Sequence, residues 1–200
     1  LEAGGAQVWR EFYVNDAGHQ IEKIANSLEA RYLQLYQEGV EMPEDAYLGG
    51  DITAHAKAFA ELHGDKYVDA PGEERRKALV DFALPKNIRG LEEDLEKYRI
   101  VYDKWFLEST IHASGEVQKV LDILREKGCT YEKDGAEWFK GEPFGTEDFV
   151  LVRSNGVPTY VVPDIAYHYN KLVTRNFDTA INVLGADHHG YVFRLKATLK

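Results

Sequence analysis

The stretch VWREFYVNDAG, residues 8–18, joins a run of β-branched and aromatic residues to a cluster of turn residues. The run at 8–14 predicts a β-strand, and the cluster at 15–18 predicts its end. Apolar residues then recur at spacings of three and four, which predicts an amphipathic helix: Ile21, Ile24, Leu28, Tyr32 and Leu35. Open α/β sheets bind ligands at the carboxyl ends of their strands, so Asn15 and Asp16 are candidate site residues. An ordinary turn and helix cap would explain the same residues.

The rest of the chain alternates between helical and hairpin patterns. The spacing of apolar residues predicts helices at 52–62, 73–82, 91–106, 115–127 and 164–173. Asp134-Gly135 and Asn155-Gly156 each lie between strand-like runs and predict β-hairpins; the second is expected to pair 150–152 with 160–162. A strand at 179–184, a loop at 185–190 and a terminal helix follow.

This order of elements predicts an α/β fold with an insertion. We expect residues 1–40 and 150–200 to form two parts of a parallel-sheet domain, with residues 41–149 as a helical and hairpin insertion between them.

Composition narrows the class of protein. The formal net charge is −10, which makes this chain alone a poor partner for RNA because phosphates are bound mainly by Lys and Arg. The lone cysteine, Cys129, excludes an internal disulfide framework and favours a reducing compartment. No apolar run long enough to span a membrane and no leader peptide is evident, so we expect a cytoplasmic protein without membrane contact.

The segment at 159–168, TYVVPDIAYH, places a phenol and a carboxylate at a predicted corner between a strand and a helix. Asp164 follows Pro163, where it could cap the helix while Tyr160 packs in the core. Alternatively, Tyr160 and Asp164 face one pocket, where the carboxylate accepts two parallel hydrogen bonds from a guanidinium and the ring lies against its plane. The residues alone leave both interpretations open.

The segment at 185–191, GADHHGY, follows the predicted last strand. Asp187 could cap the next helix, with His188 and His189 in a solvent-exposed loop. A metal site is disfavoured, because adjacent histidine rings diverge and no Cys or Glu-x-x-His companion is near.

In series, five blocks of the sequence resemble arginyl-tRNA synthetases. They are residues 10–18, 101–109, 134–138, 159–168 and 185–191, and the resemblance spans about residues 8–198. The resemblance implies a class I synthetase with a Rossmann-like catalytic domain and an insertion. It also implies ATP-dependent activation of L-arginine, with release of pyrophosphate, and transfer of the arginyl group to tRNA(Arg) with release of AMP.

The resemblance also assigns roles to individual residues. Tyr160 and Asp164 match the recognition of the substrate guanidinium, and Asp187 and His188 fall near the substrate amino group and the ATP site. Asn15 and Asp16 would lie at the pocket rim. ATP would be used with Mg²⁺ in the full-length enzyme, which we expect to be a monomer; this chain itself is expected to hold no metal and no tightly bound cofactor.

Two signatures of class I synthetases are missing from the sequence. Neither His-x-Gly-His nor a Lys-Met-Ser-Lys-Ser-like loop is present, so the catalytic residues remain unassigned and this chain alone is expected to be inactive and to bind tRNA weakly. Two alternatives follow: a non-catalytic synthetase-like protein that binds arginine or docks on a partner, and a phosphoesterase that uses Asp187, His188 and His189 as metal ligands. The second would need an Asp-x-Asp pair on an upstream strand, which the sequence lacks.

Overall fold

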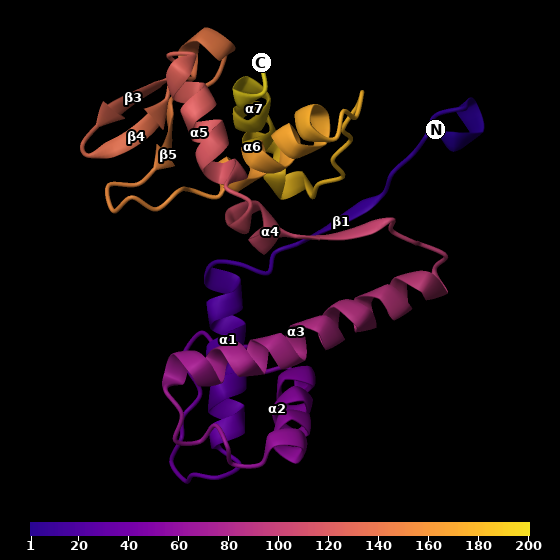
Figure 1. Ribbon diagram of the computed structural model, residues 1–200, viewed down its shortest axis with the longest axis vertical. Helices are drawn as coiled ribbons and strands as arrows, with labels where there is room; N and C mark the ends of the chain where they lie inside the picture. The colour runs from indigo at the N-terminus through magenta and orange to yellow at the C-terminus, as the bar shows by residue number, and fades with distance from the viewer. The chain divides into compact units, whose positions relative to one another are not determined.

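The computed structural model describes all 200 residues, apart from the side chains of His19, Asp187 and His189. The chain divides into two compact units, Leu1–Leu107 and Glu108–Lys200. Each unit combines helices with a small sheet (Figure 1). The chain is therefore an α/β protein, as the sequence predicts, while the predicted boundaries at 40 and 149 stay a prediction.

The first unit is built from two strands and three long helices. Its elements are η1 (Glu2–Gly4), β1 (Glu11–Val14), α1 (His19–Leu33), α2 (Gly50–His63), α3 (Gly72–Lys97) and β2 (Lys104–Leu107). β1 and β2 pair in parallel, and Phe12 lies opposite Trp105 with the two rings stacked at 4.6 Å between centroids. Parallel strands need a long crossover, which the three helices supply. A parallel pair is thus present, although its second strand lies within residues 41–149, which were predicted to form the insertion.

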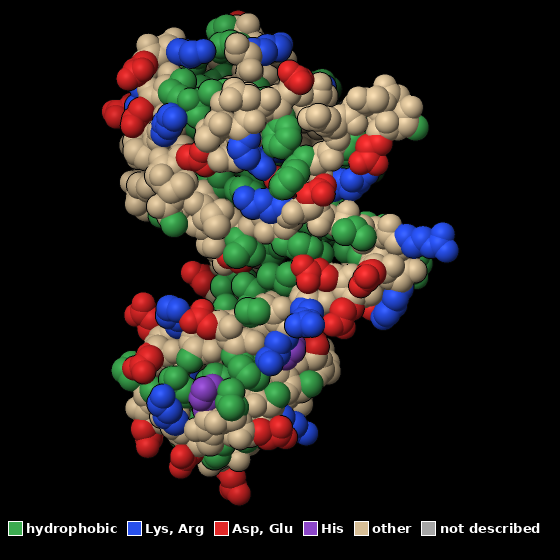
Figure 2. All heavy atoms as spheres, turned by 45° about the vertical axis from the view of Figure 1, so that its right-hand side comes forward, with side chains coloured by type: hydrophobic (Ala, Val, Ile, Leu, Met, Phe, Trp, Pro, Cys, Tyr) green, Lys and Arg blue, Asp and Glu red, His purple; other side chains and the backbone are tan. Residues whose placement is uncertain are grey.

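The three helices of the first unit share one apolar core. Its buried members recur at helical spacing on each helix: Leu28, Tyr32, Ile52, Ala56, Phe59, Leu79 and Ala83. The Tyr32 hydroxyl donates a hydrogen bond of 2.8 Å to the carbonyl of Gly64, which ends α2. On the outer faces, acidic and basic side chains are interspersed (Figure 2), as in the Lys77–Asp81 ion pair.

Arg75, on α3, fixes the loop between α2 and α3. Its Nε donates to Glu29 of α1, and its Nη1 donates to the carbonyls of Tyr67, Val68 and Ala70 at 2.9–3.1 Å. The Arg75 side chain is only 12% exposed. A partly buried guanidinium therefore satisfies backbone carbonyls that no helix or strand pairs.

We expect Arg75→Met to lower the free energy of unfolding by about 2–4 kcal/mol, because three carbonyls lose the Arg75 donor and Glu29 loses one of its two ion-pair partners. Arg76→Met is the matched control: Arg76 makes an ion pair with the same Glu29 and is 38% exposed. Its loss should cost under about 1 kcal/mol. Urea unfolding measures both values, and equal losses would contradict the role given to Arg75.

The second unit has a three-stranded antiparallel sheet beside a helical layer. Its elements are α4 (Glu108–Ala113), α5 (Glu116–Glu126), β3 (Thr130–Lys133), β4 (Ala136–Phe139), η2 (Glu142–Phe144), β5 (Phe149–Val152), α6 (Val161–Tyr169), the π-helical turn η3 (Asn170–Thr174), η4 (Ala186–His188) and α7 (His189–Thr198). The strand order is β3-β4-β5. α6 packs against α4, α5 and α7, and its buried side chains include Val161, Val162 and Ile165.

The first predicted hairpin is confirmed and the second is only partly formed. Asp134 and Gly135 both have positive φ (53° and 73°), as a two-residue turn between β3 and β4 requires. After β5, the chain turns at Gly156 and makes one bridge, between Val152 and Pro158. Pro158 has no N–H to extend a ladder, and α6 begins at Val161 in place of the predicted strand at 160–162.

The helices predicted at 73–82 and 91–106 are replaced by one longer helix, α3, followed by the strand β2. α3 runs unbroken from Gly72 to Lys97 with Pro85 inside it, where breaks were expected at 82 and 91. It stops where Arg99 adopts a positive φ of 59°, and residues 104–107 then pair with β1. Packing against α1 and α2 outweighs the cost of one proline, and pairing with β1 overrides the helical spacing at 98–106.

The strand predicted at 179–184 does not form. These residues make no ladder hydrogen bonds in the part of the chain that the structure describes, and Val183 is 95% exposed. Their β-branched side chains suit a strand, but a strand exists only with a partner, and β5 already ends its own pairing at the bridge to Pro158.

No helix described in the structure is long and apolar enough to cross a lipid bilayer.

Candidate functional site

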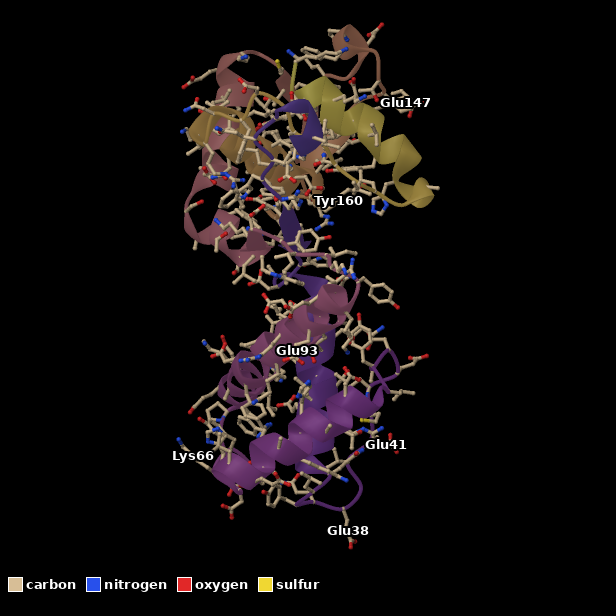
Figure 3. All side chains as sticks on the ribbon, turned by 90° about the vertical axis from the view of Figure 1, so that its right-hand side faces the viewer. Glu38, Glu41, Lys66, Glu93, Glu147 and Tyr160 are labelled. Carbon is tan, nitrogen blue, oxygen red and sulfur yellow. The ribbon has the colours of Figure 1, made fainter. Side chains whose placement is uncertain are left out.

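The candidate site is built on the first turn of α6. Tyr160 is the N-cap residue of this helix, and Asp164 follows within its first turn, where a carboxylate is favoured by the helix dipole. Tyr160 is 63% exposed, so it is not a core residue. Figure 3 labels Tyr160 beside the ribbons of α6 and α7.

Tyr191 of α7 connects the two predicted residues. Its hydroxyl donates a hydrogen bond to Oδ2 of Asp164. Its ring packs against the ring of Tyr160, with centroids 5.7 Å apart and an angle of 43° between the planes. The structure therefore groups Tyr160 and Asp164 around a second phenol, while a shared pocket for a substrate stays a prediction.

The same contact decides the role of Asp164 within the fold. The N-cap of α6 makes no side-chain capping bond, and the Asp164 carboxylate binds a hydroxyl from another helix. The helix-capping interpretation is thus not what the structure shows. Sequence reasoning missed Tyr191, although it closes the block at 185–191; the available signal was a tyrosine in a polar block, whose hydroxyl needs a partner once its ring is packed.

The surroundings of Asp164 make its charge costly. Burial raises the pKa of the Asp164 carboxyl group above its ordinary value, and the nearby carboxylate of Glu108 raises this pKa further. The hydrogen bond from Tyr191 and the electrostatic effects of Lys171 and His188 lower the pKa of Asp164, but burial has the largest effect. A partly desolvated carboxylate of this kind is stabilised by any cation that reaches it.

His188 lies at the edge of this group. Its ring meets the ring of Tyr191 edge-on, with centroids 6.4 Å apart. The side chain of Asp187 lies outside the described residues, so its predicted place beside the substrate stays a prediction. Within the part of the chain that the structure describes, no three His, Cys, Asp or Glu side chains are grouped so as to hold a metal ion.

Asn15 and Asp16 belong to the other compact unit. They follow β1, and the Asp16 N–H donates a hydrogen bond of 3.1 Å to the carbonyl of Val14. Gly18 then begins α1 with a positive φ of 74°. These residues therefore stand at the carboxyl end of a parallel strand, as predicted, while their role at a pocket rim stays a prediction.

The fold and this group of side chains define an α/β protein with a partly buried carboxylate grouped with two tyrosine rings. Comparison with known proteins adds the family. The chain is 61% identical to an arginine–tRNA ligase of Caldanaerobacter subterraneus subsp. tengcongensis and 54% identical to one of Ruminiclostridium cellulolyticum, in both cases over its whole length and 36% of the relative.

A solved structure agrees with these relatives. A protein from Campylobacter jejuni assigned as an arginyl-tRNA synthetase superposes with a TM-score of 0.83 at 34% identity, over 94% of this chain and 41% of that one. No family model matches the sequence. The chain belongs to the arginyl-tRNA synthetases and corresponds to about a third of the length of these curated relatives. The comparisons give no support to a phosphoesterase or to a non-catalytic protein.

Asp164→Asn is expected to leave the chain as stable as the original, or more stable, at pH 7. The raised pKa of Asp164 means that the folded state prefers the neutral group, so this contribution to stability is present at low pH and is lost as the pH rises through the raised pKa. The gain from Asn should therefore vanish in acid, where the wild-type group is neutral too.

Thermal unfolding of both proteins between pH 3 and 8 measures this difference (the range is about that over which a carboxyl with a raised pKa titrates). A carboxylate that stabilised the helix through its charge would behave in the opposite way, because Asp164→Asn would then lower the stability at neutral pH by about 0.3–1 kcal/mol.

Proposed function

We propose that the complete protein is an arginine–tRNA ligase, which uses ATP to activate L-arginine and then transfers the arginyl group to tRNA(Arg). The observation that carries this proposal is the partly buried Asp164 carboxylate, held by Tyr191 beside the exposed ring of Tyr160. The names of the curated relatives support the same activity.

Asp164 is proposed to bind the guanidinium of the substrate. The Tyr191 hydroxyl takes one acceptor position on Oδ2. A carboxylate has about four such positions, which leaves room for the two parallel N–H donors of a guanidinium. The Tyr160 ring, 63% exposed, can lie against the planar cation. Binding then places a positive charge beside a carboxylate whose burial is otherwise unfavourable, which stabilises both groups.

The remaining predicted residues are proposed to hold the other end of arginine and the nucleotide. Asp187 would bind the substrate amino group, and His188, Asn15 and Asp16 would line the ATP side of the pocket. Mg²⁺ would enter with the ATP phosphates, which supply most of its ligands in such sites. The fold proposed for the complete catalytic domain is Rossmann-like, with residues 1–40 and 150–200 as its parts and residues 41–149 as an insertion.

The reaction proposed for this site has two steps. In the first, a carboxylate oxygen of arginine forms a bond to the α-phosphorus of ATP while the bond to pyrophosphate breaks, which gives arginyl-adenylate. In the second, a ribose hydroxyl of the terminal adenosine of tRNA attacks the arginyl carbonyl and AMP leaves. The protein contributes mainly positioning and charge stabilisation. The complete protein is proposed to act as a monomer in the cytoplasm, and this chain alone, with a formal net charge of −10, is proposed to bind tRNA weakly.

In the complete enzyme, Asp164→Asn is expected to raise the Michaelis constant for arginine by at least about tenfold, because a charge-assisted pair with the guanidinium is lost. The constant for ATP should change far less. Steady-state aminoacylation with each substrate varied in turn gives both values.

The wild-type enzyme provides the control for this charge. Its Michaelis constant for arginine should rise as the pH falls through the raised pKa of Asp164, because a protonated carboxyl group cannot form the ion pair. The Asn variant should lack this dependence. Equal effects of the substitution on arginine and ATP would count against the proposed role.

Tyr160→Ala is expected to raise the Michaelis constant for arginine by about threefold to tenfold through the loss of its ring from the guanidinium. Tyr160→Phe is the matched control, because it keeps the ring and removes only the hydroxyl. Its arginine dependence should stay close to that of the wild type. If Tyr160→Ala leaves the arginine constant unchanged, the ring serves packing against Tyr191 alone.

A further inference from the structure

One turn after Asp164, two polar side chains and a backbone carbonyl meet at a buried histidine. His168 on α6 is 6% exposed, and its Nδ1 lies 2.7 Å from the backbone carbonyl oxygen of Asp164. Its Nε2 lies 2.6 Å from Nδ2 of Asn182. Lys171, in the π-helical turn η3, places Nζ 3.1 Å from Oδ1 of Asn182 and 3.4 Å from Nε2 of His168.

The chemistry of the two ends fixes the direction of every hydrogen bond between them. A lysine ammonium can only donate and a backbone carbonyl can only accept. The amide atom of Asn182 that faces Lys171 must therefore be its oxygen, which turns the NH₂ group toward His168. Nε2 of His168 then accepts, and Nδ1 carries the proton that is donated to the Asp164 carbonyl. The result is a chain from Lys171 through Asn182 and His168 to Asp164.

This arrangement requires a neutral imidazole. A proton on Nε2 would face the amide NH₂ of Asn182 and the ammonium of Lys171. Burial, as the larger effect, and the charge of Lys171 both lower the pKa of His168. Lys171 is in turn held over the ring of Tyr167, with Nζ 4.1 Å from its centroid. Among the described residues, Lys171 is the charged group that acts on the imidazole.

This series of hydrogen bonds joins two segments that carry the candidate site. His168 belongs to α6, whose first turn presents Asp164 and which Tyr160 precedes. Asn182 belongs to the segment 179–184, which makes no ladder hydrogen bonds in the described structure and leads into His188 and Tyr191. Asn182 thus bonds this segment to both His168 and Lys171.

We propose that His168, as an Nδ1-protonated neutral imidazole held by Asn182 and Lys171, is a positioning residue that fixes the segment 179–184 against the helix turn bearing Asp164. This inference rests on the proposed arginine site. It assigns to His168 no contact with substrate. Its expected effect is on the affinity for arginine, because the chain joins the turn that holds the carboxylate to the segment that leads to Tyr191.

The first test reads the tautomer directly in the complete enzyme. Histidine-selective ¹³C and ¹⁵N labelling allows the ring of His168 to be followed by NMR, with its signals assigned by their loss in His168→Gln. A single Nδ1-protonated tautomer is expected at pH 7.5 (about one unit above the ordinary histidine pKa). The Nε2-protonated tautomer, or a mixture of the two, would overturn the inference.

The second test changes the middle of the chain. In Asn182→Asp, one carboxylate oxygen still accepts from Lys171, but the other can bind Nε2 of His168 only when that nitrogen is protonated. The pKa of His168 should therefore rise by about one unit or more. Asn155→Asp is the matched control, because it adds the same charge at an exposed turn in the same unit and should leave the titration of His168 unchanged. An unchanged pKa of His168 in Asn182→Asp would contradict the proposed series of hydrogen bonds.

The third test connects the chain to the site. Asn182→Ala should raise the Michaelis constant for arginine by about threefold to tenfold and change that for ATP by less than about twofold. If the tautomer is as expected and Asp164→Asn weakens arginine binding, but Asn182→Ala affects both substrates alike or neither, the positioning role is overturned and the proposed function stands. If Asp164→Asn itself leaves the arginine constant unchanged, the proposed function fails, while the tautomer and titration results still report on the chain.

Discussion

The hydrogen bond from the Tyr191 hydroxyl to the Asp164 carboxylate is the interaction on which the second unit's chemistry depends. A carboxylate taken out of water is costly unless donors or cations surround it. One donor from α7 is enough to orient this carboxylate, but the raised pKa of Asp164 shows that its charge is not fully compensated. At neutral pH such a carboxylate is stabilised by a nearby cation, while in acid a proton removes the same cost.

Two successive turns of α6 carry polar residues that differ in charge. Asp164 in the first turn carries the charge, and His168 in the next carries none, because burial and Lys171 lower its pKa. The four-residue spacing places both on one face, while Val162 and Ala166 are buried in the apolar core. The same helix is thus packed by its apolar residues and carries both polar groups on one face.

Local sequence patterns predicted those parts of the fold that depend on local interactions. β1, α1, α2, α5 and the Asp134-Gly135 hairpin form where periodicity and turn residues place them. The predictions that were wrong concern segments whose structure depends on pairing with residues distant in sequence. Residues 104–107 form a strand because β1 lies beside them, and residues 179–184 form none because no strand pairs with them in the described structure.

The candidate site shows the same division. Spacing placed Tyr160 and Asp164 at one helix start but could not choose between a cap and a binding group, because both uses put a carboxylate in the first turn of a helix. Substrate binding stays a proposal, and the cap is set aside by Tyr191, which is distant in sequence and lies on α7. By taking one acceptor position it also limits what can bind at the others. A guanidinium supplies both a charge and parallel donors there, whereas a neutral ureido group supplies donors alone and leaves the desolvated charge uncompensated. The proposed selectivity for arginine over its neutral isosteres therefore rests on the burial of one carboxylate.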